Sequence, residues 1–287
     1  PPFYALWVLF ALVGIALAPA VDRAGARRLA ALAVGVAFFA GGVNAYLAVM
    51  AMALATGVTA RLVLFERRFK PAEGVAWLVG GPAATLASMG LFGYFHGLGG
   101  PKMKLGAEGF GQFSADLATF VNANTSSRLF GALPMGGRQY EGAAYLGLGV
   151  LALLGVRLVI FALDRKVDRR RLLALAPLLA LIAGMFFYAL SVHVTFLGRA
   201  VLELPRLYAL LGELTSIFRS SGRFVWPLHA LLVAVALSSL ARFASRPWLT
   251  RGMILAALLI QVVDFNPTPA GPHPPHARFE AFKDPAW

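Results

Sequence analysis

The chain has 287 residues, of which 59% are hydrophobic and 14% are charged, and its mean hydropathy is +0.72. Because soluble domains carry about 25% charged residues, this composition excludes an ordinary soluble globular protein, and the lack of cysteine excludes disulfides, thiolate metal sites and thiol nucleophiles. The net charge of +13 comes from basic residues in short turns between apolar runs, a pattern typical of membrane proteins and not of a nucleic-acid-binding face.

The apolar runs predict an all-α, polytopic transmembrane protein with about eight membrane helices over residues 1–264. A membrane-crossing helix needs about 20 apolar residues. The run 29–65 is too long for one crossing and contains Gly41-Gly42-Val43-Asn44, so we predict two helices there, at about 29–43 and 46–64. The alternative is one long tilted helix or a re-entrant segment. The other predicted spans are 3–20, 74–96, 142–163, 172–195, 224–241 and 252–263.

The basic residues support this division. With the break at Gly41-Gly42, the turns on one side of the membrane hold 15 Lys and Arg (3 + 4 + 5 + 3) in 39 residues. The opposite segments 97–141, 196–223 and 265–287 hold 10 (4 + 4 + 2) in 96 residues. The positive-inside bias then predicts a bacterial cytoplasmic (inner) membrane protein whose short basic loops are cytoplasmic. The basic turns are 21–28, 61–73, 164–171 and 242–251.

The first long extracytoplasmic loop, 97–141, carries two acidic candidates. Asp116 lies in the stretch 113–121, which we expect as a short helix at the membrane surface. Glu141 directly precedes a predicted helix, and two interpretations are open. It caps that helix and complements its dipole, or it is a partly desolvated carboxylate suited to general-base catalysis.

The second long loop, 196–223, ends in a cluster of basic residues. Arg219 and Arg223 are four residues apart, so they share a face if the segment is helical. Arginine binds phosphate bidentately, but these side chains are equally expected to reach lipid headgroups, with Trp226 as an interfacial anchor. Pro227 fits the first turn of the next helix, with Ser220 or Ser221 as its cap.

Four polar residues mark the outward ends of predicted helices: Asn44, Tyr46, His193 and Asp264. Polar groups at such positions are functional candidates, and interhelical hydrogen bonding explains them equally well. We predict no metal site, because the prolines of His273-Pro274-Pro275-His276 forbid the helical spacing of a zinc motif.

Several short motifs together carry a family resemblance over most of residues 29–264. They are Gly109-Phe110-Gly111, Ser114-Ala115-Asp116-Leu117, Tyr140-Glu141-Gly142, Tyr145-Leu146-Gly147-Leu148-Gly149 and Phe218-Arg219-Ser220-Ser221-Gly222-Arg223-Phe224-Val225-Trp226-Pro227. The combination resembles an uncharacterised bacterial family of multi-pass membrane proteins that is similar to the GT-C glycosyltransferases. The turn Asn44-Ala45-Tyr46-Leu47 departs from a His-Pro-Tyr-like sequence that members often carry.

The resemblance implies a partial GT-C-like fold and the transfer of a sugar from a polyprenyl-phosphate carrier to an acceptor at the extracytoplasmic face. It implies Glu141, and as second choice Asp116, as the carboxylate that orients or deprotonates the acceptor. The cations expected to stabilise the phosphate are Arg219, Arg223 and Arg138. The residues expected to complete the substrate-binding region are Tyr140, Tyr145, Asn44, Tyr46 and His193.

The implied partners are membrane lipids, the polyprenyl-phosphate sugar and other membrane subunits. A divalent cation stays open as cofactor. GT-C enzymes carry an acidic residue in their first outward loop, and this chain, which opens with Pro1-Pro2, is expected to begin downstream of it. We expect 265–287 to be the start of a further C-terminal segment.

A second class of function stays open. A non-catalytic multi-pass subunit or scaffold, or a lipid-handling transporter, also fits a membrane chain without an obvious nucleophile. Transporters often contain broken helices in matching halves, and only the break at Gly41-Gly42 is evident here.

Overall fold

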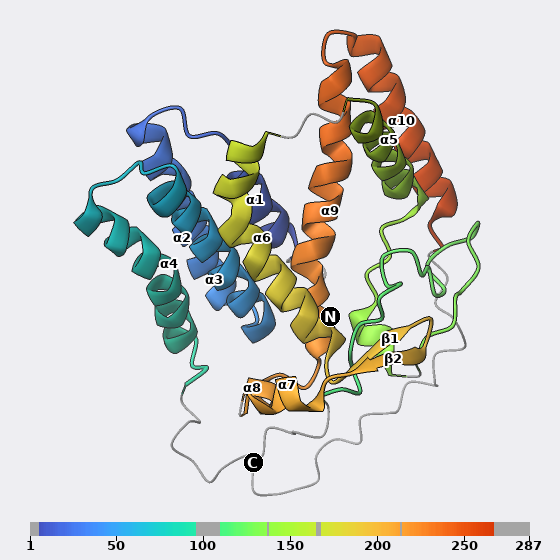
Figure 1. Cartoon of the computed structure of the whole chain (residues 1–287), viewed down its shortest axis with the longest axis horizontal. Coiled ribbons are helices and arrows are strands. Elements are labelled where there is room, and N and C mark those ends of the chain that lie inside the picture. The colour runs from blue at the N-terminus through green and yellow to red at the C-terminus, as the bar shows by residue number, and fades with distance from the viewer. Residues whose placement is uncertain (1–5, 96–109, 137, 165–167, 213, 267–287) are drawn as a thin grey trace, which may run out of the picture.

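The computed structural model describes residues 6–95, 110–136, 138–164, 168–212 and 214–266. It is a helical protein, as predicted, whose long helices run side by side between two ends (Figure 1). Residues 97–109 of the first predicted loop and residues 267–287 of the predicted C-terminal segment lie outside the described residues. The long helices are α1 (Trp7–Leu17), α2 (Arg23–Gly41), α3 (Ala45–Ala60), α4 (Pro71–Leu91), α5 (Leu148–Asp164), α6 (Arg169–Leu190), α9 (Trp226–Ser238) and α10 (Pro247–Asp264).

Six segments of the described chain are long and apolar enough to cross a membrane, which corrects the expected eight. The two that fall short are α1, described over 11 residues, and α5, which has 17. The latter begins at Leu148 and not at residue 142, because the chain makes a short turn and an extended stretch first. The six are α2, α3 continued to Phe65, α4, α6, Ser221–Phe243 and α10.

The predicted break at Gly41-Gly42 is confirmed. Helix α2 ends at Gly41 and α3 begins at Ala45. The side chain of Asn44 caps α3 by accepting a hydrogen bond from the Tyr46 backbone N–H at 2.9 Å. The two helices pack against each other as a hairpin, so one long helix is excluded.

Small residues let the helices of this bundle approach closely. Five alanines of α2, spaced three or four residues apart, are completely buried. A stripe of this kind brings backbones together where lipid supplies no hydrophobic driving force. The packed helix α3 is the most buried of the six spans. The five alanines are Ala26, Ala30, Ala33, Ala37 and Ala40.

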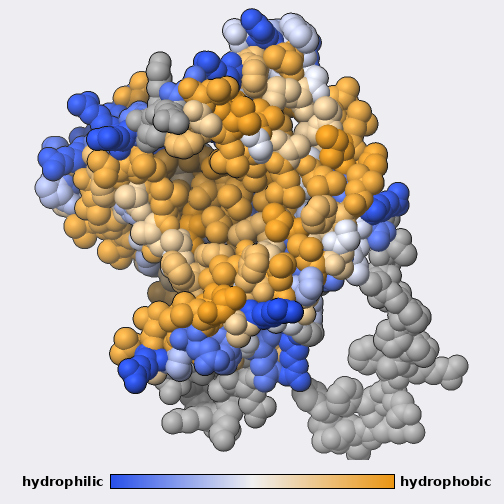
Figure 2. Space-filling view, turned by 45° about the vertical axis from the view of Figure 1, so that its right-hand side comes forward, coloured by the Kyte–Doolittle hydropathy of each residue, from blue (hydrophilic) through white to orange (hydrophobic). Residues whose placement is uncertain are grey.

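The described residues of the four basic turns gather at one end of the helices, at the top of Figure 1, and the described residues of the two long loops lie at the other end. Figure 2 shows apolar side chains over the middle of the molecule and hydrophilic ones at the two ends. Six membrane-length helices with this distribution describe a multi-pass membrane protein.

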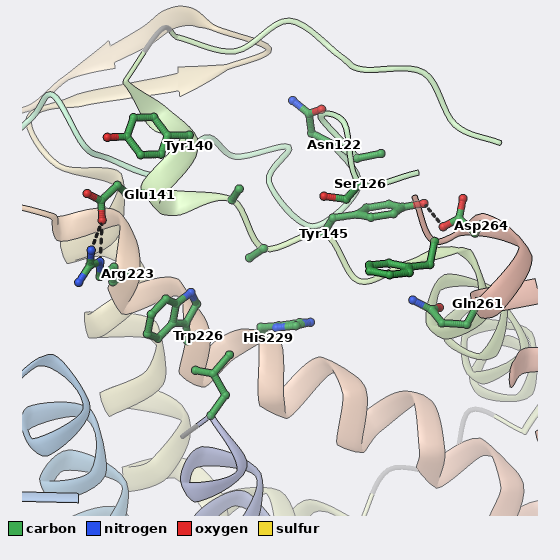
Figure 3. Close-up of a pocket in the computed structure, with 15 residues that line it drawn as sticks. Asn122, Ser126, Tyr140, Glu141, Tyr145, Arg223, Trp226, His229, Gln261 and Asp264 are labelled. Carbon is green, nitrogen blue, oxygen red and sulfur yellow. Dashed lines mark hydrogen bonds and ion pairs between the residues drawn. The ribbon is translucent and has the colours of Figure 1, made fainter. Parts of the chain in front are cut away.

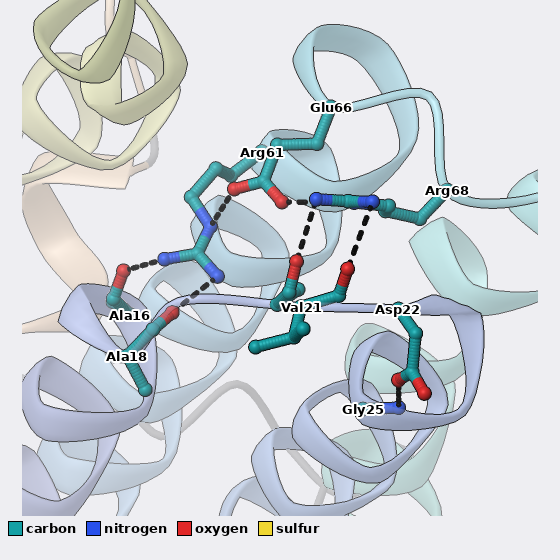
Figure 4. A network of polar contacts seen from close by, with 9 residues as sticks. Ala16, Ala18, Val21, Asp22, Gly25, Arg61, Glu66 and Arg68 are labelled. Carbon is teal, nitrogen blue, oxygen red and sulfur yellow. Dashed lines mark hydrogen bonds and ion pairs between the residues drawn. The ribbon is translucent and has the colours of Figure 1, made fainter.

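A buried arginine fastens the basic end (Figure 4). Arg61 begins a π-helical turn (Arg61–Phe65) at the end of α3, and its guanidinium donates hydrogen bonds to the carbonyls of Ala16 and Ala18. It also pairs with Glu66 at 3.1 Å. These carbonyls end α1, so Arg61 satisfies acceptors that the helix itself leaves free.

The opposite end is covered by a layer that we call the loop layer, made of residues 110–136, 138–147, 191–212 and 214–225. Helix α6 ends at Leu190, earlier than predicted, and the chain continues into a hairpin of β1 (His193–Phe196) and β2 (Arg199–Glu203). Three short helices follow: α7 (Pro205–Ala209), α8 (Leu214–Ile217) and the 3₁₀ turn η5 (Ser221–Val225).

The predicted surface helix at 113–121 is wrong, because the segment forms turns. The backbone of Asp116 pairs with that of Thr195 in β1 as an isolated β-bridge. The Asp116 carboxylate accepts hydrogen bonds from the backbone N–H groups of Ala118, Leu197 and Gly198 at 2.8–3.1 Å. These partners hold the segment against the β hairpin in a conformation that a helix could not provide.

Candidate functional site

A pocket of about 590 Å³ lies where the loop layer meets α9 and α10. The loop layer forms its roof, while Trp226 and His229 of α9 form its floor (Figure 3). Its other lining residues are Leu6, Asn122, Ala123, Ser126, Tyr140, Glu141, Ala143, Ala144, Tyr145, Arg223, Gln261, Asp264 and Phe265.

One end of the pocket holds an ion pair between Glu141 and Arg223. Both Nε and Nη2 of Arg223 contact the same carboxylate oxygen, at 2.6 and 2.5 Å, and the Ser220 hydroxyl donates to that oxygen at 2.9 Å. The Glu141 side chain is 10% exposed and that of Arg223 is 23% exposed. The pair is therefore shielded but open to the pocket.

The ring of Tyr46 supports this pair from the tip of the predicted hairpin. The guanidinium carbon of Arg223 lies 4.9 Å from the centre of the ring, a cation–π contact. The Tyr46 hydroxyl accepts a hydrogen bond from the Ser220 backbone N–H at 2.9 Å. Tyr46 thereby links the start of α3 to the segment that carries Arg223.

Two glycines set the distance between the segments that carry the pair. Glu141 lies in the 3₁₀ turn η4 (Gln139–Gly142) and Arg223 in η5. The Gly222 N–H donates to the Phe113 carbonyl at 2.8 Å, and a methyl group added at Gly222 would lie 2.8 Å from the Cα of Gly142. No larger side chain fits this contact.

Glu141 does not cap helix α5, so the first of the two interpretations of its position is wrong, and its role in catalysis stays a prediction. Helix α5 begins at Leu148, seven residues later, and its first N–H groups are satisfied from α10 instead. Leu148 N–H donates to Asp264 at 3.1 Å, and Gly149 N–H donates to Gln261 at 3.1 Å. The carboxylate of Glu141 is left for Arg223 and Ser220.

Asp264 and Gln261 form the opposite end of the pocket (Figure 3). The Tyr145 hydroxyl donates to Asp264 at 2.9 Å, and Ser127 donates to the other oxygen of the same carboxylate. Burial and the neighbouring Asp264 carboxylate raise the pKa of Tyr145 to about 12. Sequence reasoning noted Asp264 only as polar and missed Gln261, although both lie on the last turns of an apolar helix.

Of the two arginines expected to stabilise a phosphate, Arg223 lines the pocket. Arg219 is exposed, lies 4.9 Å from the centre of the Phe113 ring and does not line the pocket. Because η5 starts only at Ser221, the two arginines do not share a helical face. The expected serine cap is also wrong, since Ser220 bonds Glu141 and the Ser221 hydroxyl has no partner among the described residues, while Pro227 does lie in the first turn of α9.

The remaining predicted site residues lie around the pocket without lining it. Arg138 donates to Gln112 on the surface. His193 is exposed at the start of β1, 3.6 Å from Glu203. Asn44 serves as a helix cap, and Asp116 anchors the loop layer. Trp226 is buried at the pocket floor and is not an exposed interfacial anchor.

Residues 3–266 match the family described as a domain of unknown function (DUF6311). The chain belongs to this family. Neither the curated proteins nor the solved structures contain a match to it.

The pocket gives this DUF6311 chain a carboxylate and a guanidinium at one end and a carboxylate with a tyrosine at the other. Arginine binds phosphate, and a shielded carboxylate can accept a proton. Within the described part of the DUF6311 chain, no cluster of three or more His, Asp or Glu residues could hold a metal ion.

Proposed function

We propose that this protein is a membrane glycosyltransferase similar to the GT-C enzymes. It transfers a sugar from a polyprenyl-phosphate carrier to a hydroxyl acceptor in the pocket beneath the loop layer. In this proposal the four basic turns are cytoplasmic, and the pocket opens on the extracytoplasmic side of the bacterial inner membrane.

The observation that carries the proposal is the ion pair between Glu141 and Arg223 at one end of the pocket. A phosphate group that enters the pocket competes with the carboxylate for the Arg223 guanidinium. When the phosphate binds there, Glu141 loses its cation. Donor binding thus frees the Glu141 carboxylate to accept a hydrogen bond from the acceptor hydroxyl.

The reaction follows from these two roles. The acceptor oxygen bonds to the anomeric carbon of the sugar as the bond from that carbon to the phosphate oxygen breaks. The acceptor proton passes to Glu141, and polyprenyl phosphate leaves with the bonding electron pair. Arg223 stabilises the negative charge that develops on the leaving phosphate.

The lining of the pocket supports a lipid-linked donor. Alanines and large apolar side chains make up much of its wall, among them Leu6 of the segment before α1 and Phe265 after α10. Tyr140 and Trp226 lie beside the ion pair (Figure 3), where aromatic rings suit the apolar faces of a sugar. Arg219 and Arg138 are proposed to attract the anionic donor from the surface of the loop layer.

The proposal is tested by measuring sugar transfer by the purified full-length protein from radiolabelled polyprenyl-phosphate glucose and mannose. We expect Glu141→Gln to slow transfer by about 10²–10⁴-fold and Arg223→Ala by about 10²–10³-fold. The matched controls are Glu203→Gln and Arg199→Ala, exposed positions of β2 that leave the pocket intact. Transfer within twofold of wild type in both pocket variants would contradict the proposal.

The same experiment separates the alternative functions. Binding of polyprenyl phosphate that depends on Arg223, without transfer of either sugar, would favour a lipid-handling transporter. Neither binding nor transfer, together with stable association with other membrane proteins, would favour a scaffold.

A further inference from the structure

The two ends of the pocket differ in charge. The Glu141 carboxylate is neutralised by Arg223. At the other end Asp264 is 1% exposed, and no cationic side chain pairs with it in the described part of the chain. Its partners are the hydroxyls of Tyr145 and Ser127 and the N–H of Leu148, all of them uncharged. This end therefore keeps a net negative charge.

The hydrogen bond from Tyr145 to Asp264 fixes what this end can recognise. Because the Tyr145 hydroxyl gives its proton to the carboxylate, the phenol oxygen presents lone pairs to a ligand and acts as an acceptor. A ligand hydroxyl can donate to such an oxygen. A phosphate or carboxylate group without a proton cannot, and the negative charge of Asp264 repels it.

The neighbouring side chains suit the apolar face of a carbohydrate ring. Tyr145 and Phe265 line the pocket at this end, and the ring of His229 lies on the floor between the two ends (Figure 3). Pockets for small molecules combine aromatic walls with a few placed polar groups. Here the polar groups near Asp264 include the Gln261 amide and the Ser126 hydroxyl.

We propose that the Asp264 end of the pocket binds the acceptor through its hydroxyl groups, and that this acceptor is an uncharged carbohydrate. The assignment rests on the proposed function, because it identifies which partner of the transfer reaction this end holds. The phosphate of the donor then lies at Arg223, and acidic sugars are excluded as acceptors by Asp264.

The test compares two ligands that differ in one group. Benzyl glucoside and benzyl glucuronide share the ring and the benzyl group, but the second carries a carboxylate in place of a hydroxymethyl group. Binding is measured by equilibrium dialysis against the full-length protein in lipid nanodiscs, with empty nanodiscs as the blank. We expect the glucoside to bind at least about tenfold more tightly than the glucuronide.

Substitutions assign that preference to the site. Asp264→Asn removes the charge and should reduce the preference to about threefold or less. The control Asp164→Asn makes the same chemical change at the far end of α5, where the carboxylate pairs with Arg242 at 3.4 Å, and should leave the preference unchanged. If Asp264→Asn does not fold, Tyr145→Phe serves instead, since loss of its acceptor oxygen should weaken glucoside binding several-fold.

Three results would overturn the inference: equal binding of the two ligands, no binding of either, or a preference that survives the loss of Asp264. Glycoside binding requires neither a lipid donor nor turnover, so the two proposals can fail separately. Discrimination without sugar transfer would leave a carbohydrate site and remove the transferase. Transfer without discrimination would leave the transferase and remove this acceptor site.

Discussion

The contact between Gly142 and the segment 113–115 offers a quantitative test of the site geometry. A methyl group added at Gly142 would lie 2.6 Å from both the Cα of Ala115 and the carbonyl oxygen of Ser114. Ordinary van der Waals contact begins at 3.4 Å, so the segments must separate by at least 3.4 − 2.6 = 0.8 Å. Both neighbouring atoms belong to the backbone, and neither can turn aside.

The expected cost of Gly142→Ala follows from that displacement. Overpacking of this kind costs about 1–3 kcal/mol, which lowers the melting temperature of a domain of this size by about 2–12 °C. Glu141 precedes the substituted residue, and the 2.6 Å contact from its carboxylate to Arg223 would lengthen toward the limit of a hydrogen bond. We therefore expect sugar transfer to fall together with stability, because Glu141 and Arg223 no longer hold their relative positions.

The assay is thermal unfolding in detergent micelles, followed by tryptophan fluorescence. The matched control is Gly155→Ala in α5, where an added methyl group meets nothing within 4 Å. That change should be neutral or stabilise by up to about 1 kcal/mol, because alanine favours the helix. If Gly142→Ala melts with or above the control, the close approach of the two segments is not a feature of the folded protein.

Three further predictions concern other parts of the chain. Asn44→Ala should lower stability by about 0.5–2 kcal/mol through loss of the α3 cap, and Asn44→Asp should restore it; equal melting of the two variants would contradict the cap. Arg61→Leu should cost about 1–3 kcal/mol, because it leaves the carbonyls of Ala16 and Ala18 without donors, while Glu66 keeps its contact with Arg68; unchanged melting or expression would refute this. The raised pKa of Tyr145, about 12, means that the folded state holds this proton more tightly than the unfolded state. Stability from this group is full below about pH 10 and falls as pH rises toward 12, so Tyr145→Phe should flatten that fall in alkaline unfolding curves.

The parts of the fold that depend on local sequence were predictable. The break at Gly41-Gly42 is visible as two glycines inside an overlong apolar run, and the capping of α3 by Asn44 follows from the residue type. The gathering of the basic turns at one end follows from counting helices between them. None of these features requires a contact between distant residues.

The predictions that were wrong concern segments whose structure depends on contacts between distant residues. Helix α5 begins at Leu148 because Asp264, 116 residues away, accepts its N–H. The stretch 113–121 is not a helix because Asp116 bonds the backbone of Leu197 and Gly198 in the other loop. A single sequence contains no signal for such partners, so Gln261 and the role of Asp264 in the pocket could not be found from it.

The candidate site was predictable from the sequence only in part. The positive-inside count placed Glu141 and Arg223 in one compartment, and the structure joins them at 2.6 Å. The spacing of Arg219 and Arg223 suggested a shared helical face, but the short turn η5 starts between them. Charge patterning thus assigned both residues to the same end of the helices, and tertiary contacts selected which arginine reaches the carboxylate.

The proposed reaction requires the pocket and the basic turns to lie on opposite sides of the membrane. The 287 residues contain no cysteine, so single cysteines can be introduced at Leu129 in the loop layer, 59% exposed, and at Val21 in a basic turn, 87% exposed. In intact bacterial cells a membrane-impermeant maleimide should label Leu129→Cys at once and Val21→Cys only after the membrane is permeabilised. Labelling of Val21→Cys in intact cells, with Leu129→Cys protected, would turn the pocket toward the cytoplasm and contradict the proposed reaction.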